Sequence, residues 1–203
     1  MFGLYLPPTT RSGSQSCAMS AILAPPAKRG TTRRQRDELY ALIESGYFGE
    51  AKVELIGGEL VTAMPEPSLH DATVERIFAI LSGLMPGCVY RQDYIELPQG
   101  DAVQPDVFVL QGDSAEQPLL VVEVALGTLR RDRTIKSELY AAAGTIEYWI
   151  VNPRARQIEV RTDASGSEYV VLGVFGEGDT LRPLFAPEHE IAVGRLIPPP
   201  DRS

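Results

Sequence analysis

A chain of 203 residues, 44% of them hydrophobic, has room for one domain with a sizeable buried core. No apolar run reaches the roughly 18 residues of a membrane span, and the first residues lack the pattern of a secretory signal. The net charge of −8 at pH 7 argues against tight, non-specific coating of nucleic acid, and the two cysteines, Cys17 and Cys88, are too few for a disulfide framework. We therefore expect a cytoplasmic protein without membrane contact.

Residues 1–30 contain basic side chains and no acidic ones, and they are rich in Ser, Thr, Pro and Gly without any periodicity. This composition predicts a disordered basic extension. Thr31 or Thr32 can then cap a helix that runs to about Ser45, with its apolar residues on one face.

Two short β-prone runs within 52–61 flank Gly57-Gly58, which predicts a hairpin turn between them. A helix with an apolar stripe is predicted for 68–84. Three β-rich runs follow, at 89–97, 103–110 and 119–126.

The stretch 130–143 has the pattern of a helix, and Gly144 is typical of its C-terminal end. Further strands are predicted at 147–151, 157–161, 169–175 and 190–193, followed by a tail at 198–203. The order of elements favours one α+β or mixed α/β domain over 31–197, with helices packed on a mixed sheet.

Asp106 and Glu123 each interrupt a strongly apolar strand, where a charged residue is rare unless something compensates it. If the two strands form a simple antiparallel hairpin around the loop 111–117, Asp106 lies opposite Glu123 on the same face. A divalent cation such as Mg²⁺ would relieve the repulsion between the two carboxylates. The alternatives are that each carboxylate pairs with an Arg or Lys, or that a bulge shifts the register.

A lysine follows on the next helix. Lys136 shares a helix face with Leu139, Tyr140 and Ala143, and not with the exposed face of Arg131 and Glu138. From there it can reach a phosphate charge or orient a water molecule, or it can extend to solvent as most lone lysines do.

These residues resemble the pattern of the PD-(D/E)XK nuclease superfamily, and in particular its Uma-type branch of putative restriction endonucleases. That branch lacks the usual lysine two residues after the glutamate and carries one on the following helix. The resemblance covers about 32–162. Its pieces are Val53-Glu-Leu-Ile-Gly-Gly-Glu-Leu60, Met64-Pro with His70, Gln104-Pro-Asp-Val107, Val121-Val-Glu-Val124, Arg131-Asp-Arg133 with Lys136 and Leu139-Tyr140, and Glu147-Tyr-Trp-Ile-Val-Asn-Pro153.

The resemblance implies a restriction-endonuclease-like core with Asp106 and Glu123 as ligands of Mg²⁺ or Mn²⁺, and with Lys136 as the catalytic lysine. Glu54 and His70 would be secondary members of the site. The other interpretations are a solvent-facing hairpin charge for Glu54 and a helix-terminal hydrogen bond for His70.

Arg130, Arg131 and Arg133 at the start of the same helix can meet backbone phosphates. A solvated helix start is the alternative, but cations at a helix N-terminus oppose the helix dipole, which favours an anionic partner.

The preferred interpretation is a metal-dependent DNA endonuclease, and a homodimer would supply the two centres needed to cut both strands. The segment after Glu123, Ala125-Leu-Gly-Thr-Leu129, departs from the family's Ser-Pro-Ser-Thr-like loop. A nuclease fold that lost catalysis and serves as a binding or regulatory module is therefore the alternative. A carboxylate glycosidase is a third, which gives Lys136 no role.

Overall fold

The structure, a computed structural model, describes residues 31–63, 68–111 and 117–199, so the predicted N-terminal extension and the end of the predicted tail lie outside it. The helices are α1 (Arg33–Glu44), α2 (Leu69–Leu84), α3 (Leu129–Arg131), α4 (Ser137–Ala142) and α5 (Val193–Leu196), with a π-helical turn η1 (Asp132–Lys136) between α3 and α4. The strands are β1 (Lys52–Ile56), β2 (Glu59–Ala63), β3 (Val89–Arg91), β4 (Ile95–Glu96), β5 (Ala102–Val103), β6 (Val107–Val109), β7 (Leu120–Val124), β8 (Glu147–Asn152), β9 (Gln157–Ser165), β10 (Glu168–Gly176), β11 (Thr180–Leu181) and β12 (Ile191–Ala192).

The first helix and hairpin form where local sequence signals place them. Thr32 is the N-cap of α1 and forms a capping box with Gln35, so two of the helix's otherwise unpaired N–H groups are satisfied. Gly57 and Gly58 have φ angles of 60° and 81°, which the tight turn between β1 and β2 requires. Both predictions are confirmed.

The strands form a six-stranded sheet in the order β10-β9-β8-β7-β6-β3, a four-stranded sheet in the order β2-β1-β5-β4, and the pair β11-β12. β7 and β8 are parallel, and the connection between them consists of α3, η1 and α4. The predicted mixed α/β fold with helices on a mixed sheet is confirmed.

Two predicted strands were wrong in extent. The run 89–97 is divided between β3 and β4, and the run 103–110 between β5 and β6, and in each case the two halves belong to different sheets. The backbone at Gln92 adopts a φ of 50°, and Pro105 has no N–H to donate to a ladder, so neither run continues as one strand. At the C-terminal end, the predicted strand 190–193 is the short β12, and α5 follows it directly.

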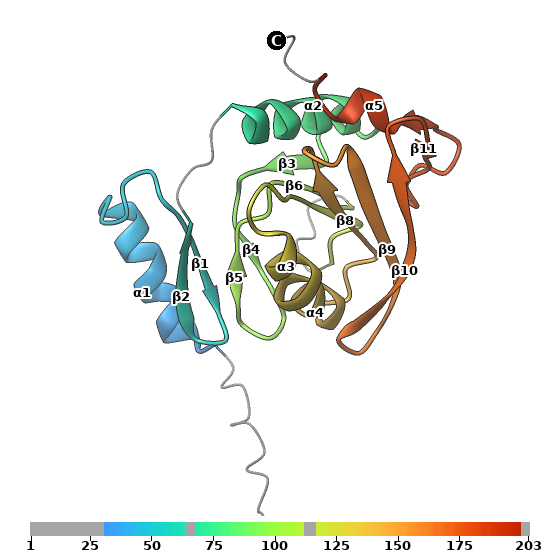
Figure 1. The fold of residues 1–203 in the computed structure, drawn as a ribbon. Helices are drawn as coiled ribbons and strands as arrows, with labels where there is room; N and C mark the ends of the chain where they lie inside the picture. Colours follow the sequence, from blue (N-terminus) through green and yellow to red (C-terminus); the bar gives the residue numbers. More distant parts are fainter. Residues whose placement is uncertain (1–30, 64–67, 112–116, 200–203) are drawn as a thin grey trace, which may run out of the picture.

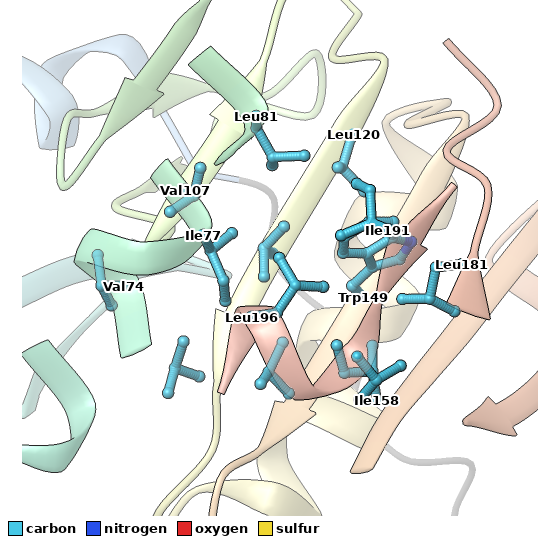
Figure 2. Close-up of a cluster of buried hydrophobic side chains, with 14 of the residues drawn as sticks. Val74, Ile77, Leu81, Val107, Leu120, Trp149, Ile158, Leu181, Ile191 and Leu196 are labelled. Atoms are coloured by element: carbon cyan, nitrogen blue, oxygen red, sulfur yellow. The ribbon is translucent and has the colours of Figure 1, made fainter. Parts of the chain in front are cut away.

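The six-stranded sheet is covered on both faces (Figure 1). On one face, Val74, Ile77 and Leu81 of α2 and Leu196 of α5 pack on alternate sheet residues such as Trp149 (Figure 2). On the other face, Tyr140 of α4 packs against a second set, which includes Phe108, Val121, Tyr148 and Ile150.

This arrangement explains why β7 is apolar almost throughout. Leu120, Val122 and Val124 face α2, whereas Val121 faces α4. Because side chains alternate along a strand, Glu123 also lies on the α4 face. The carboxylate of Glu123 therefore lies on the sheet face that η1 and α4 cover.

Candidate active site

Asp106 and Glu123 come together at the end of the β6–β7 hairpin. Val107 pairs with Val122 and Val109 with Leu120, the predicted register, so Asp106 precedes β6 at the level of Glu123. Asp106 is 3% exposed and Glu123 is 4% exposed. The backbone N–H of Val124 donates a hydrogen bond of 2.7 Å to Asp106 Oδ2, which fixes this carboxylate against β7.

A lysine ammonium lies between the two carboxylates. Lys52 Nζ is 3.0 Å from Asp106 Oδ1 and 3.8 Å from Glu123 Oε2. Burial by itself would lower the pKa of Lys52, but the charges of Glu123 and Asp106 outweigh it and raise that pKa above its usual value. Lys52 is therefore a cation shared by both carboxylates.

Lys136 forms a second charged group beside the first. Its Nζ donates to Glu123 Oε1 at 3.0 Å and closely contacts Glu54 Oε1, which also accepts the backbone N–H of Gln104 at 2.9 Å. Burial favours a raised pKa for Glu54, but Lys136 and then Lys52 hold it below its usual value. Tyr140 completes the group by donating its hydroxyl to Glu123 Oε1 at 2.6 Å.

The helix that carries Lys136 is not regular, which the sequence did not predict. Residues Asp132–Lys136 form a π-helical turn between α3 and α4, whereas the pattern of 130–143 predicted one continuous α-helix. A π turn inserts one extra residue per turn, so it rotates the following side chains relative to those before it. Asp132, Lys136 and Tyr140 are all buried.

His70 reaches Asp106 from the N-terminal end of α2. Its Nε2 lies 3.2 Å from Asp106 Oδ2, and its Nδ1 lies 3.2 Å from Asp71 Oδ1. Burial lowers the pKa of His70, but the hydrogen bond and charge of Asp106 raise it to about 8. For Asp106, burial by itself would raise the pKa, but Lys52 and His70 hold it well below its usual range.

The carboxyl of Asp132 has a raised pKa, in contrast to the lowered pKa values of Asp106 and Glu54. Burial and then the charge of Glu123 raise its pKa from 3.8 to about 7, although Thr128 donates its hydroxyl to Asp132 Oδ2 at 2.6 Å. A carboxyl that titrates near neutrality next to ionised ones has the property expected of a proton donor or acceptor.

The three predicted phosphate-binding arginines are not equivalent. Arg131 lies in the site and forms an ion pair with Glu54. Arg133 is directed to Glu159 of β9, and Arg130 is exposed at the start of the helix. The structure therefore brings Arg131, but not Arg133, to the carboxylates.

Most of the charged groups of the site line one cavity of about 630 Å³ between the α1–β1–β2 segment and the six-stranded sheet. Its lining includes Lys52, Glu54, His70, Asp106, Glu123, Arg131, Asp132 and Lys136. In Figure 1, α1, β1 and β2 stand to the left of the sheet, and α3 and α4 lie in front of it.

The family model Uma2, described as "Putative restriction endonuclease", matches residues 36–194. The chain belongs to the Uma2 family. Among solved structures it is similar to "a putative nuclease belonging to DUF820" from Anabaena variabilis ATCC 29413, with a TM-score of 0.55 and 18% identity over 71% of this chain and 88% of that one. At this identity the likeness establishes a shared fold. No curated protein matches the chain.

The residues of this Uma2 member fit a hard divalent cation in one respect. Asp106 and Glu123 already hold one cation, the Lys52 ammonium, between their oxygens. Within the described ranges, however, no group of three or more His, Cys, Asp or Glu side chains is arranged as a metal cage. Mg²⁺ suits such a site, because it binds through one or two carboxylates and keeps water or phosphate as its other ligands.

Lys52 and Asp132 were not predicted from the sequence to be members of the site. Lys52 and Glu54 are two residues apart in a strand, so the sequence places them on one face. The partner Asp106, however, lies more than 50 residues further along the chain, and nothing in the sequence points from Lys52 to it. In the part of the chain that the structure describes, no helix is both long and apolar enough to span a membrane.

Proposed function

We propose that this Uma2 member is a metal-dependent endonuclease that hydrolyses phosphodiester bonds of DNA. One observation carries the proposal: Asp106, Glu123 and Lys136 meet in a single buried cluster, in a chain whose family is described as "Putative restriction endonuclease". Two neighbouring carboxylates and a lysine are the groups that metal-assisted phosphodiester hydrolysis needs.

Asp106 and Glu123 would hold Mg²⁺ or Mn²⁺, and the bound ion supplies a Lewis acid and lowers the pKa of water. The Val124 N–H and His70 orient Asp106, and Tyr140 orients Glu123.

Lys136 contributes the positive charge that opposes the growing negative charge on the phosphate. Its ammonium is already placed by Glu54 and Glu123, so little reorganisation is needed when a phosphate arrives. Arg131, paired with Glu54, adds a second cation beside it.

Cleavage of plasmid and single-stranded DNA by the purified protein in Mg²⁺, Mn²⁺ or EDTA tests this proposal. We expect Asp106→Asn, Glu123→Gln and Lys136→Met each to lose about 100-fold or more of the rate, the scale on which a transition-state contact acts. A matched control is Glu147→Gln, which changes a buried carboxylate that Trp149 and Leu184 hold outside the cavity. Equal cleavage by all variants, or cleavage that persists in EDTA, would refute the assignment.

A second candidate is a nuclease fold that binds without cutting. Two observations favour it: the Lys52 ammonium already compensates the carboxylate pair, and the segment Ala125–Leu129 has one hydroxyl, that of Thr128, which is engaged with Asp132. If the wild type neither cuts in any metal nor binds Mn²⁺ calorimetrically, but still binds DNA, this second function replaces the first.

A further inference from the structure

The reactive groups lie at the floor of a cavity and not on an open surface. The side chains of Asp106, Glu123 and Lys136 are 4%, 6% and 2% exposed. A scissile phosphate must approach within a few ångströms of such groups, so it has to enter the cavity. A volume of about 630 Å³ lies within the range of small-molecule pockets, so it suits one or two nucleotides and not a paired double helix.

Apart from Glu50, the wall that α1, β2 and the loop between α1 and β1 contribute to this cavity is apolar. Ile43 comes from α1, Phe48 from the loop that follows, and Val61 and Ala63 from β2. Phe48 is half-buried, and the ring of Tyr47 packs edge-on against it, with centroids 5.1 Å apart and planes at 88°. Tyr47 itself is 73% exposed. A purine or pyrimidine stacks on such a surface irrespective of its sequence.

The charges of the site also disfavour binding of a closed duplex. Duplex binding relies on many lysine and arginine contacts to the phosphate backbone. Here Lys52, Lys136 and Arg131 already form ion pairs with carboxylates inside the cavity, and the whole chain carries a net charge of −8. A stacked base would supply affinity that phosphate contacts alone do not provide.

We propose that the cavity is a subsite for an unpaired nucleotide, in which the phosphate meets Asp106, Glu123 and Lys136 while an adjacent base stacks against Phe48, Ile43 and Val61. The substrate is then single-stranded DNA, or the unpaired part of a gapped duplex, in preference to a closed duplex. This inference rests on the proposed function and specifies its substrate.

Fluorescence anisotropy tests this substrate preference. One labelled DNA sequence is offered as a single strand, a gapped duplex or a closed duplex, with Ca²⁺ in place of Mg²⁺ to keep the DNA intact. We expect the first two to bind about tenfold or more tightly than the closed duplex. Phe48→Ala should weaken single-strand binding about 5- to 150-fold, as loss of one stacked base does. Leu60→Ala is the matched control, because Leu60 is an exposed residue of β2 that does not line the cavity.

Phe48 also packs on the core cluster of α1, so Phe48→Leu serves as a second variant that keeps an apolar side chain and removes the ring. A strand of abasic sites should bind the wild type weakly and be insensitive to Phe48→Leu. Equal affinity for duplex and single strand, or unchanged single-strand binding in Phe48→Leu, overturns the base subsite. If the wild type still cuts duplex DNA in Mg²⁺, the nuclease function survives that result, whereas failure to bind or cut any nucleic acid refutes both.

Discussion

Replacing Lys52 by Met removes a positive charge that lies 3.0 Å from Asp106 Oδ1 and 3.8 Å from Glu123 Oε2. Without a metal ion, the variant keeps two nearly buried carboxylates beside each other and loses a cation between them. Deleting one partner of a buried ion pair costs about 3 to 5 kcal/mol. Because the Lys52 side chain is 27% exposed, we expect the free energy of unfolding in EDTA to fall by about 2 to 4 kcal/mol.

We expect Mg²⁺ to restore the free energy of unfolding that Lys52→Met loses in EDTA. In the wild type, an arriving divalent ion meets the Lys52 ammonium. Two unit charges 4 Å apart at an effective dielectric of 20 repel by about 4 kcal/mol, so a divalent ion and an ammonium repel by about 8 kcal/mol. Removing even a sixth of that repulsion makes Mg²⁺ bind about tenfold more tightly. At an Mg²⁺ concentration about 100 times the dissociation constant, the bound ion stabilises the folded chain by about 2.7 kcal/mol.

Urea unfolding in EDTA and in Mg²⁺, together with calorimetric titration of Mg²⁺, measures both effects. Lys52→Arg is the matched control, since it keeps the charge and should bind Mg²⁺ as the wild type does. The reasoning fails if Lys52→Met is equally destabilised in EDTA and in Mg²⁺ while its Mg²⁺ affinity is unchanged or weaker.

Three further variants test the surroundings of the site. Between pH 4 and 7 the folded chain keeps the proton of Asp132 that the unfolded chain has released, so stability falls as pH rises, by about 1.36 kcal/mol per pKa unit. Asp132→Asn should therefore flatten urea-unfolding stability over this window in EDTA and be the more stable protein at pH 8; parallel pH profiles would contradict this. Tyr140→Phe removes the hydroxyl that donates to Glu123 and should cost about 1.5 to 3 kcal/mol in the same assay, whereas a neutral effect would mean that water replaces it. Thr32→Ala removes the cap of α1 and should cost about 1 kcal/mol, with Thr134→Ala, an exposed helical residue, as the comparison.

Features encoded by neighbouring residues were predicted well. The cap at Thr32, the turn at Gly57-Gly58 and the register that sets Asp106 at the level of Glu123 each depend on a few adjacent residues. Periodicity could not show that 89–97 and 103–110 each pass from one sheet to another, because each run has buried apolar residues on both sides of the change. That change of sheet depends on packing between distant segments.

The π turn and the position of Lys52 were out of reach for a related reason. An α-helix and a helix with one π turn have nearly the same apolar pattern over 14 residues, and only tertiary contacts select between them. Lys52 reads as an ordinary strand lysine until β1 is packed beside the β6–β7 hairpin. Long-range ion pairs of this kind leave no spacing in the sequence from which to infer them.

The charges of the cavity explain how the proposed metal site can fold before it holds an ion. Glu54, Asp106 and Glu123 are three nearly buried negative charges, and several kcal/mol per unpaired ion would oppose folding. Cations of the same chain oppose them, namely Lys52, Lys136 and Arg131, and His70 beside Asp106 adds another at pH 7 because its pKa is raised to about 8. A divalent ion adds charge to a group that is already balanced, so its affinity depends on a cation moving away or an anion arriving. A substrate phosphate is such an anion, and we therefore expect metal and DNA to bind more tightly together than either does alone.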